Sequence, residues 1–200
     1  VVDLDNYPIK EYGNVAIQDD INYEYKIVWI GSPSTQHYLE LLIKPLQTLS
    51  KNYNFILQVI GSKKISIPLI NIEIIPWSDK TESQLIRNCD IGVMPLPDLS
   101  WEKGKCGYKI IQYMASGLPV VASPVGVNKA IIDHGDNGFL ASNDDQWISA
   151  FEELFNSKAL RVKMGLSGRN EVKNKYSLSL TAPTLADSFK RVYLMNNRKQ

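Results

Sequence analysis

Residues 101–126 have the sequence WEKGKCGYKIIQYMASGLPVVASPVG, in which a loop, a helix, a strand and a second loop follow one another directly. The first loop contains lysines and glycines, and a short amphipathic helix follows it. A Gly-Leu-Pro stop then leads into an apolar strand at 119–122, which ends in the small-residue loop 123–126. A helix N-terminus presents unpaired N–H groups and the positive end of a dipole, so this arrangement favours a phosphate-binding site.

The rest of the chain alternates short apolar runs with helical patterns. We expect further strands at 26–30, 55–60, 71–75, 90–94 and 139–141, and helices starting after Ser34, running from Ser78 or Asp79 to Asn88, and at 130–133, 144–156, 158–175 and 180–195. Pro45 lies inside the first helical pattern and should kink it or divide it in two, and Glu82 should complete a capping box with Ser78 or Asp79. Because apolar strands alternate with helices, we predict a doubly wound α/β fold with a mostly parallel, Rossmann-like sheet and a helical C-terminal tail.

The composition limits the classes of function. With 200 residues, of which 44% are hydrophobic, the chain can bury one substantial core. A net charge of +1 gives no general attraction to nucleic acid or to a membrane, and the apolar runs are too short to cross a bilayer. The two cysteines lie apart and no set of His, Cys and carboxylate residues has metal-ligand spacing. This pattern indicates a reducing compartment, and neither a disulfide scaffold nor a metal site.

The beginning of the chain differs in character from the rest. Residues 1–24 are polar and rich in turn-forming residues, and we interpret them as a linker or an irregular lead-in. The chain starts at Val1 and not at Met, so we expect it to be a fragment of a longer protein.

In a parallel sheet the loops after the strands line the ligand crevice, which here gives loops 31–37, 61–64, 76–79, 95–109 and 123–128. The chain has no Gly-x-Gly-x-x-Gly after its first strand and no Walker loop, which disfavours a dinucleotide oxidoreductase and a P-loop NTPase. The best anion site is the loop at 104–109. There Gly107 lets the backbone approach an anion, and Lys105 and Lys109 can add charge-assisted hydrogen bonds. The alternative is that these lysines are solvated surface residues.

Four segments together resemble the C-terminal, donor-binding half of a GT-B-fold glycosyltransferase of the group 1 class (family four, retaining). They are VWIG at 28–31, NCDIGVMPLP at 88–97, KIIQYMASGLPVVASPVG at 109–126 and NGFL at 137–140, the last followed by Asp144 and Asp145. The resemblance covers residues 26–141 and implies that residues 25–200 form a nucleotide-sugar donor-binding domain. Residues 1–24 would then be the interdomain linker, and the N-terminal, acceptor-binding domain would be absent from this chain.

The resemblance also implies an activity. Such an enzyme transfers a sugar from a nucleotide-diphosphate-sugar donor to a carbohydrate or lipid-linked acceptor in polysaccharide, lipopolysaccharide or glycolipid assembly. It needs no metal or other cofactor, and it retains the anomeric configuration. We expect a cytoplasmic protein that meets the inner membrane only through the missing domain, with no nucleic-acid partner. The isolated fragment is expected to be inactive.

Residue roles follow from the same resemblance. The family has two glutamates, eight residues apart, that contact the donor sugar and the ribose; Gly104 and Gln112 occupy these positions here. Gln112 keeps its hydrogen-bonding capacity toward a ribose, whereas Gly104 has no side chain to offer. We therefore expect Lys109, with Lys105, to contact the diphosphate or an acidic sugar. Backbone N–H groups of the loop that includes Cys106, Gly107 and Tyr108 should support them.

The remaining expected contacts lie in neighbouring loops. Gly31 and Ser32 belong to the first loop, which lacks the strong cation that relatives often carry there. Trp77 and Ser78 should lie against the base, although Trp77 could equally pack under the sheet edge. Asp98 should face the donor sugar, and Gly126 should mark a second helix N-terminus for phosphate or sugar oxygens.

Two other classes of protein are compatible with this pattern. One is a non-catalytic nucleotide- or partner-binding module derived from the same fold, which the missing glutamates favour. The other is a nucleotide-sugar epimerase with a related fold, which would need acidic residues in the cleft. Loops 31–37 and 123–130 provide none.

Overall fold

Six parallel strands form one sheet in the order β3-β2-β1-β4-β5-β6 in the computed structural model, which describes residues 1–12 and 23–197. The strands are β1 (Tyr25–Ile30), β2 (Phe55–Ile60), β3 (Asn71–Ile75), β4 (Ile91–Met94), β5 (Val120–Ala122) and β6 (Gly138–Leu140). The order reverses between β1 and β4, so the loops after these two strands diverge and leave a crevice at the carboxyl edge. The predicted doubly wound, parallel α/β fold is confirmed.

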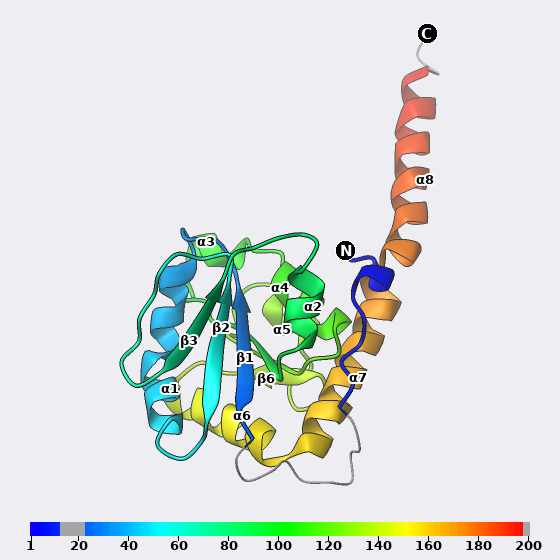
Figure 1. Cartoon of the computed structure of the whole chain (residues 1–200). Coiled ribbons are helices and arrows are strands. Elements are labelled where there is room, and N and C mark those ends of the chain that lie inside the picture. Colours follow the sequence, from blue (N-terminus) through cyan, green and yellow to red (C-terminus); the bar gives the residue numbers. More distant parts are fainter. Residues whose placement is uncertain (13–22, 198–200) are drawn as a thin grey trace.

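Helices cover both faces of this sheet (Figure 1). They are η1 (Leu4–Asn6), η2 (Gln36–Leu42), α1 (Ile43–Leu49), α2 (Glu82–Arg87), α3 (Ser100–Lys103), α4 (Tyr108–Ala115), α5 (Asn128–Ile131), α6 (Asp144–Asn156), α7 (Lys158–Lys175) and α8 (Leu178–Asn197). One core contains buried residues of α2, α4 and α5, and the other contains those of α1 and α6; η2 contributes Tyr38 to the first core and Leu39 and Leu42 to the second. Alternate residues of β1 serve the two sides: Val28 belongs to the first core and Trp29 to the second.

The predicted elements agree with the structure except at several helix starts and at α3, whose residues lie in the stretch 95–109 that was expected to be a loop. Pro45 lies in the first turn of α1, just after the 3-10 helix η2. Proline is tolerated there because it has no backbone N–H, and residues of a first turn have no intrahelical acceptor for one. The predicted division of this helix is therefore confirmed. The predicted caps are wrong: Thr35 precedes η2 and Thr81 precedes α2, and neither side chain makes a cap hydrogen bond. The predicted capping box at Glu82 is wrong because its carboxylate accepts hydrogen bonds from side chains of other elements.

The first residues of the chain pack against α4 and α7. Val2 and Tyr7 are buried, and the Val2 N–H donates to the carbonyl oxygen of Tyr176 at 3.0 Å. The Lys10 ammonium lies 3.1 Å from the carboxylate of Asp90, the residue that precedes β4 in the sequence. Residues 1–12 thus bring Tyr7 to the same side of the sheet as α2 and α4.

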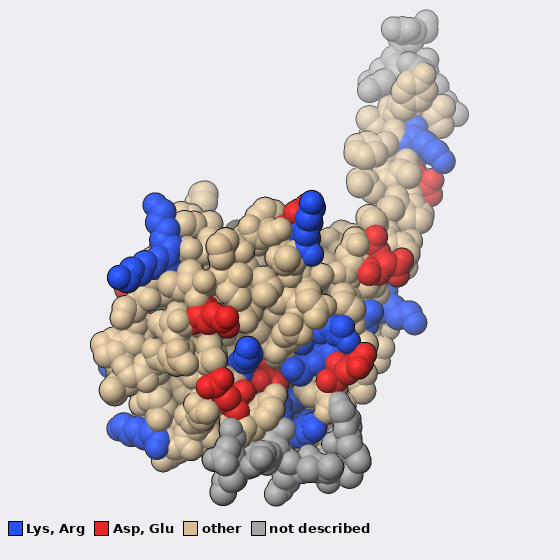
Figure 2. All heavy atoms as spheres, viewed as in Figure 1, with Lys and Arg blue, Asp and Glu red and all other residues tan. Residues whose placement is uncertain are grey.

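The last helix leaves the body of the domain (Figure 1). Many of its apolar side chains are exposed, among them Leu185, Phe189 and Tyr193. In Figure 2 few charged side chains lie on the protruding part, whereas acidic and basic residues mix over the visible face of the body. Across the described ranges 1–12 and 23–197, no helix combines the length and apolar character needed to cross a membrane.

Candidate functional site

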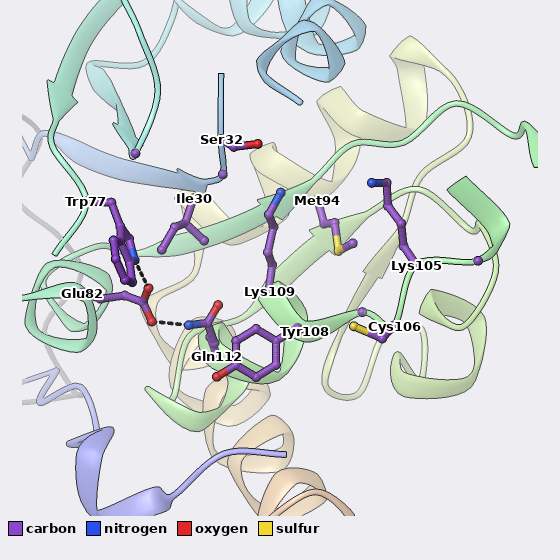
Figure 3. Close-up of a pocket in the computed structure, with 14 residues that line it drawn as sticks. Ile30, Ser32, Trp77, Glu82, Met94, Lys105, Cys106, Tyr108, Lys109 and Gln112 are labelled. Carbon is purple, nitrogen blue, oxygen red and sulfur yellow. Dashed lines mark hydrogen bonds between the residues drawn. The ribbon is translucent and has the colours of Figure 1, made fainter. Parts of the chain in front are cut away.

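A cavity of about 760 Å³ opens at the carboxyl edge of the sheet, where the strand order reverses (Figure 3). It is lined by Ile30, Gly31, Ser32, Gly61, Trp77, Glu82, Met94, Gly104, Lys105, Cys106, Gly107, Tyr108, Lys109 and Gln112. These residues come from the loops after β1, β2 and β3, from the ends of β1 and β4, from the start of α2, and from α4 and the loop before it. The crevice predicted from the loops therefore exists and has the size of a small-molecule site.

The N-terminus of α4 faces this cavity with an open backbone. Gly107 is its N-cap, with a left-handed φ of 68°, and a Cβ there would lie 2.4 Å from Cδ1 of Ile131. Both the conformation and the space therefore require glycine. No described residue accepts a backbone hydrogen bond from the N–H of Tyr108 or Lys109, while the next N–H, of Ile110, donates to Gly107 O. The first turn thus offers free donors to an anion.

Two lysines complete this end of the cavity. Nζ of Lys109 lies 4.7 Å from the centre of the Trp29 ring, and Nζ of Lys105 lies 5.3 Å from the centre of the Tyr38 ring. Neither ammonium has a carboxylate partner within the described part of the chain. Burial, with a smaller contribution from the charge of Lys105, lowers the pKa of Lys109 to about 8. An anion placed between these groups would supply the missing countercharge.

Gly31 makes the position of Lys109 possible. A Cβ on Gly31 would lie 2.4 Å from the Trp29 ring and 3.0 Å from Nζ of Lys109. A larger residue would displace the ammonium from the ring. Gly31 therefore contributes to the cavity by leaving room for the Lys109 side chain.

Glu82 anchors the opposite wall, at the start of α2. Its Oε1 accepts hydrogen bonds from the Tyr7 hydroxyl, at 2.9 Å, and from Nε2 of Gln112, and its Oε2 accepts one from the indole N–H of Trp77. Nε2 of Gln112 also donates to the Tyr7 hydroxyl at 2.8 Å. The network fixes the Trp77 ring, which is 56% exposed, beside the cavity (Figure 3). Trp77 therefore does not pack under the sheet edge.

Most of the residues singled out from the sequence line this cavity, and three do not. Ser78 lies outside the lining, and its Oγ accepts a hydrogen bond from the Lys80 N–H at 3.3 Å. Asp98 pairs with Lys103 at 3.2 Å and lines a separate cavity of about 270 Å³. A Cβ on Gly126, whose φ is 54°, would lie 2.6 Å from Lys103 O, so this glycine packs one loop against another.

Glu82 was not predicted to be a site residue from the sequence. Its spacing from Ser78 indicated a local cap, whereas its partners lie as far away in sequence as Tyr7 and Gln112. The described residues contain no group of three or more His, Cys, Asp and Glu side chains that could hold a metal ion.

The fold, with a crevice where the strand order reverses, defines a Rossmann-like α/β class of domain. Residues 24–157, more than half of the chain, match the family model described as "Glycosyl transferases group 1". The chain therefore belongs to the group 1 glycosyl transferase family, as its motifs indicate. Among curated proteins, a D-inositol 3-phosphate glycosyltransferase from Pseudarthrobacter chlorophenolicus is 33% identical over 105 residues, which is 52% of this chain and 24% of that protein. The chain spans about a quarter of the length of the curated relatives it matches.

Solved structures share the fold. The C-terminal domain of a glycosyl transferase group 1 family protein from Francisella tularensis has a TM-score of 0.65 and 22% identity, covering 89% of this chain and 100% of that domain. The Anabaena protein Alr3699/HepE, solved in complex with UDP and glucose, has a TM-score of 0.73 and 14% identity over 94% of this chain and 55% of that protein. These neighbours share the Rossmann-like fold of this chain, and the first of them is a C-terminal domain.

Proposed function

We propose that this chain is the donor-binding half of a glycosyltransferase that takes a sugar from a nucleoside-diphosphate sugar. The observation that carries the proposal is the pair of unpartnered ammonium groups, Lys105 and Lys109, beside the open N-terminus of α4. Together they form a site for a dianionic group at the end of the sheet where the strand order reverses. Because the chain belongs to the group 1 glycosyl transferase family, we take this anion to be the diphosphate of a nucleotide-sugar donor.

The two walls of the cavity differ in a way that suits such a donor. Lys105 and Lys109 offer positive charge, while Trp77 offers a flat apolar face on the opposite wall (Figure 3). A nucleoside diphosphate has a flat base at one end and two phosphates at the other. We place the base against Trp77 and the diphosphate between the lysines and α4.

The same groups would take part in the chemistry. When the bond between the sugar and the diphosphate breaks, negative charge grows on the leaving oxygen. Lys105, Lys109 and the N–H groups at the start of α4 stabilise that charge, so they lower the barrier and do more than bind the ground state. Retention of configuration and independence of metal belong to this proposal through the family resemblance.

The division into domains is part of the proposal as well. Residues 25–200 bind the donor, residues 1–24 connect to an acceptor-binding half, and the acceptor is a carbohydrate or a lipid-linked sugar. Transfer needs both halves of the cleft. The chain by itself should bind the donor without transferring its sugar, and contact with an inner membrane would come through the acceptor half.

A non-catalytic binding module is the second candidate. Gly104, which replaces the residue that would contact the donor sugar, favours it, because glycine offers no side-chain contact. Such a module would bind the nucleoside diphosphate and its sugar conjugate with equal affinity, because the sugar would make no additional contact.

A thermal-shift screen tests the proposal, because a ligand that binds the native state raises its melting temperature. UDP, GDP and their sugar conjugates are the ligands, and NAD and ATP are the controls. We expect one nucleoside diphosphate and its sugar conjugate to stabilise the chain, and NAD and ATP to be without effect. Failure of all the diphosphates would contradict donor binding. Absence of sugar transfer by the longer protein, despite binding, would support the binding module.

A further inference from the structure

The side chain of Lys109 can act as a nucleophile as well as an anion ligand. Its Nζ lies 4.7 Å from the centre of the apolar Trp29 ring and pairs with no carboxylate in the described part of the chain. Burial, and to a smaller degree the charge of Lys105, lowers the pKa of Lys109 to about 8, so near that pH about half of these side chains carry a neutral amine. Lysines in such surroundings are the ones that form covalent bonds with electrophiles.

A small reagent can reach this amine because the side chain lines the main cavity. Lys109 is half-buried, and the cavity of about 760 Å³ is open to small molecules. Lys105 lines the same cavity, and Figure 3 shows the two side chains extending in the same direction from α4 and from the loop before it. A phosphate held by Lys105 and by the free N–H groups at the start of α4 would therefore lie beside the Lys109 amine.

An acyl phosphate combines the two groups that this arrangement suits, a phosphate and an electrophilic carbonyl carbon. The neutral amine would attack that carbon, so that a C–N bond forms, the C–O bond to the phosphate breaks and inorganic phosphate leaves with the electron pair. The amine loses one proton to the solvent, and no oxidant, reductant or further reactant is needed. A bound phosphate attracts a proton back to Lys109, so the reaction proceeds from those complexes whose amine is neutral, and proximity compensates for their smaller fraction.

We propose that Lys109 is a site of acylation by small acyl phosphates, directed to this lysine by recognition of the phosphate at Lys105. The amide product carries no positive charge and no longer attracts an anion. Acylation would therefore close the diphosphate site, a consequence that rests on the proposed function. The acyl transfer itself does not rest on it, because it needs only the anion site and the amine.

Competition between two lysines of the same chain tests this inference. The wild-type chain is treated at pH 8 with acetyl phosphate, or with N-acetoxysuccinimide as a neutral acetyl donor, until about one lysine per chain or fewer is modified. Peptide mapping by mass spectrometry measures the initial rates at Lys109 and at Lys51, an exposed lysine after α1 that lies outside the cavity lining and pairs with no described carboxylate. The neutral donor measures access and amine fraction alone, because it has no phosphate to be recognised.

We expect acetyl phosphate to favour Lys109 over Lys51 at least about tenfold more strongly than the neutral donor does, as one charge-assisted hydrogen bond to the phosphate would provide. Lys105→Met, checked for folding by an unfolding curve, should remove that difference between the two reagents. Inorganic pyrophosphate should protect Lys109 and leave the rate at Lys51 unchanged. The same preference for Lys109 with both reagents, or a Lys105→Met variant that keeps the difference, would overturn the inference.

A calorimetric titration separates this inference from the proposed function. The preferred nucleoside diphosphate is titrated into the chain before and after acetylation of Lys109, and we expect the acetylated chain to bind at least about tenfold more weakly. Undiminished affinity after acetylation would overturn the proposed closing of the site. Directed acetylation of a chain that bound no nucleoside diphosphate would support the acylation site and contradict the proposed function. Nucleotide binding without preferential acetylation of Lys109 would do the reverse.

Discussion

The ammonium of Lys109 lies 4.7 Å from the centre of the Trp29 ring, in a cavity wall where no described carboxylate neutralises it. The glycine at position 31 leaves the room that this contact requires. A half-buried cation without a carboxylate partner lowers the stability of the folded state, and an anionic ligand can compensate for that loss. The position of Lys109 is therefore explained by binding better than by folding.

Replacing this lysine should separate stability from binding. We expect Lys109→Met to raise the free energy of unfolding at neutral pH by about 1 kcal/mol, because methionine fills similar space without an unpaired charge. Binding of a nucleoside diphosphate should fall at least tenfold, through loss of a charge-assisted hydrogen bond. Denaturant unfolding and calorimetry measure the two effects. A variant that is less stable and binds normally would show that Lys109 has a structural role.

The lowered pKa of Lys109 predicts a pH dependence. Its pKa is about 8 in the folded chain, and the ordinary lysine value of 10.5 applies to the unfolded chain, so between these two values the unfolded state binds more protons. The contribution of Lys109 to the free energy of unfolding should therefore rise between about pH 8 and pH 10.5, by roughly 2 kcal/mol after allowance for its partial exposure. The difference in unfolding free energy between the wild type and Lys109→Met, measured at pH 7 and pH 10, isolates the effect. A constant difference would contradict the shifted pKa.

Gly107 should tolerate substitution less well than another left-handed glycine. A Cβ at Gly107 would meet Ile131 at 2.4 Å, whereas one at Gly135, with φ 87°, would meet nothing within 4 Å. We expect Gly107→Ala to cost about 2–4 kcal/mol, from strain plus a steric clash, and Gly135→Ala about 1–2 kcal/mol from strain alone. Chemical denaturation compares the two variants. Equal losses of unfolding free energy in the two variants would mean that the Ile131 side chain moves aside at no cost.

Trp77 should contribute to affinity through its ring. We expect Trp77→Ala to weaken nucleoside diphosphate binding by about 1–3 kcal/mol, the range for stacking of a base on an aromatic side chain. Trp77→Phe should keep most of that affinity, because a flat ring remains although the hydrogen bond to Glu82 is lost. Trp101, which is 80% exposed and outside the cavity lining, provides the control substitution Trp101→Ala. Unchanged affinity in Trp77→Ala would place the base elsewhere.

The packing of α7 against the turn after α4 depends on a close approach of the two backbones. A Cβ on Gly165 would lie 1.9 Å from the carbonyl oxygen of Gly117, in the turn that ends α4. We expect Gly165→Ala to destabilise the chain by at least about 2 kcal/mol, since a backbone atom cannot move aside as a flexible side chain would. Leu166→Ala, at a half-exposed neighbouring position of α7, should cost much less. Thermal unfolding of both variants provides the comparison.

The sequence predicts the strands and the anion loop because their signals are local. β1 and β2 are mostly apolar and buried runs closed by turn residues, and the residues of the α4 N-terminus are consecutive. The opposite wall could not be predicted in the same way. Glu82 meets Tyr7 and Gln112 only after the chain has folded, and Ser78 gave a misleading capping signal. Asp98 was expected to face a sugar, yet its ion pair with Lys103 lies outside the main cavity.

The most direct measurement is a calorimetric titration of the preferred nucleoside diphosphate into three forms of the chain at neutral pH. They are the wild type, Lys105→Met/Lys109→Met, and Lys103→Met, which removes an exposed lysine from the same loop region outside the cavity lining. We predict similar affinity for the wild type and Lys103→Met and a loss of about a hundredfold or more for the double variant. Equal affinity for all three forms would contradict the assignment of this cavity as the diphosphate site.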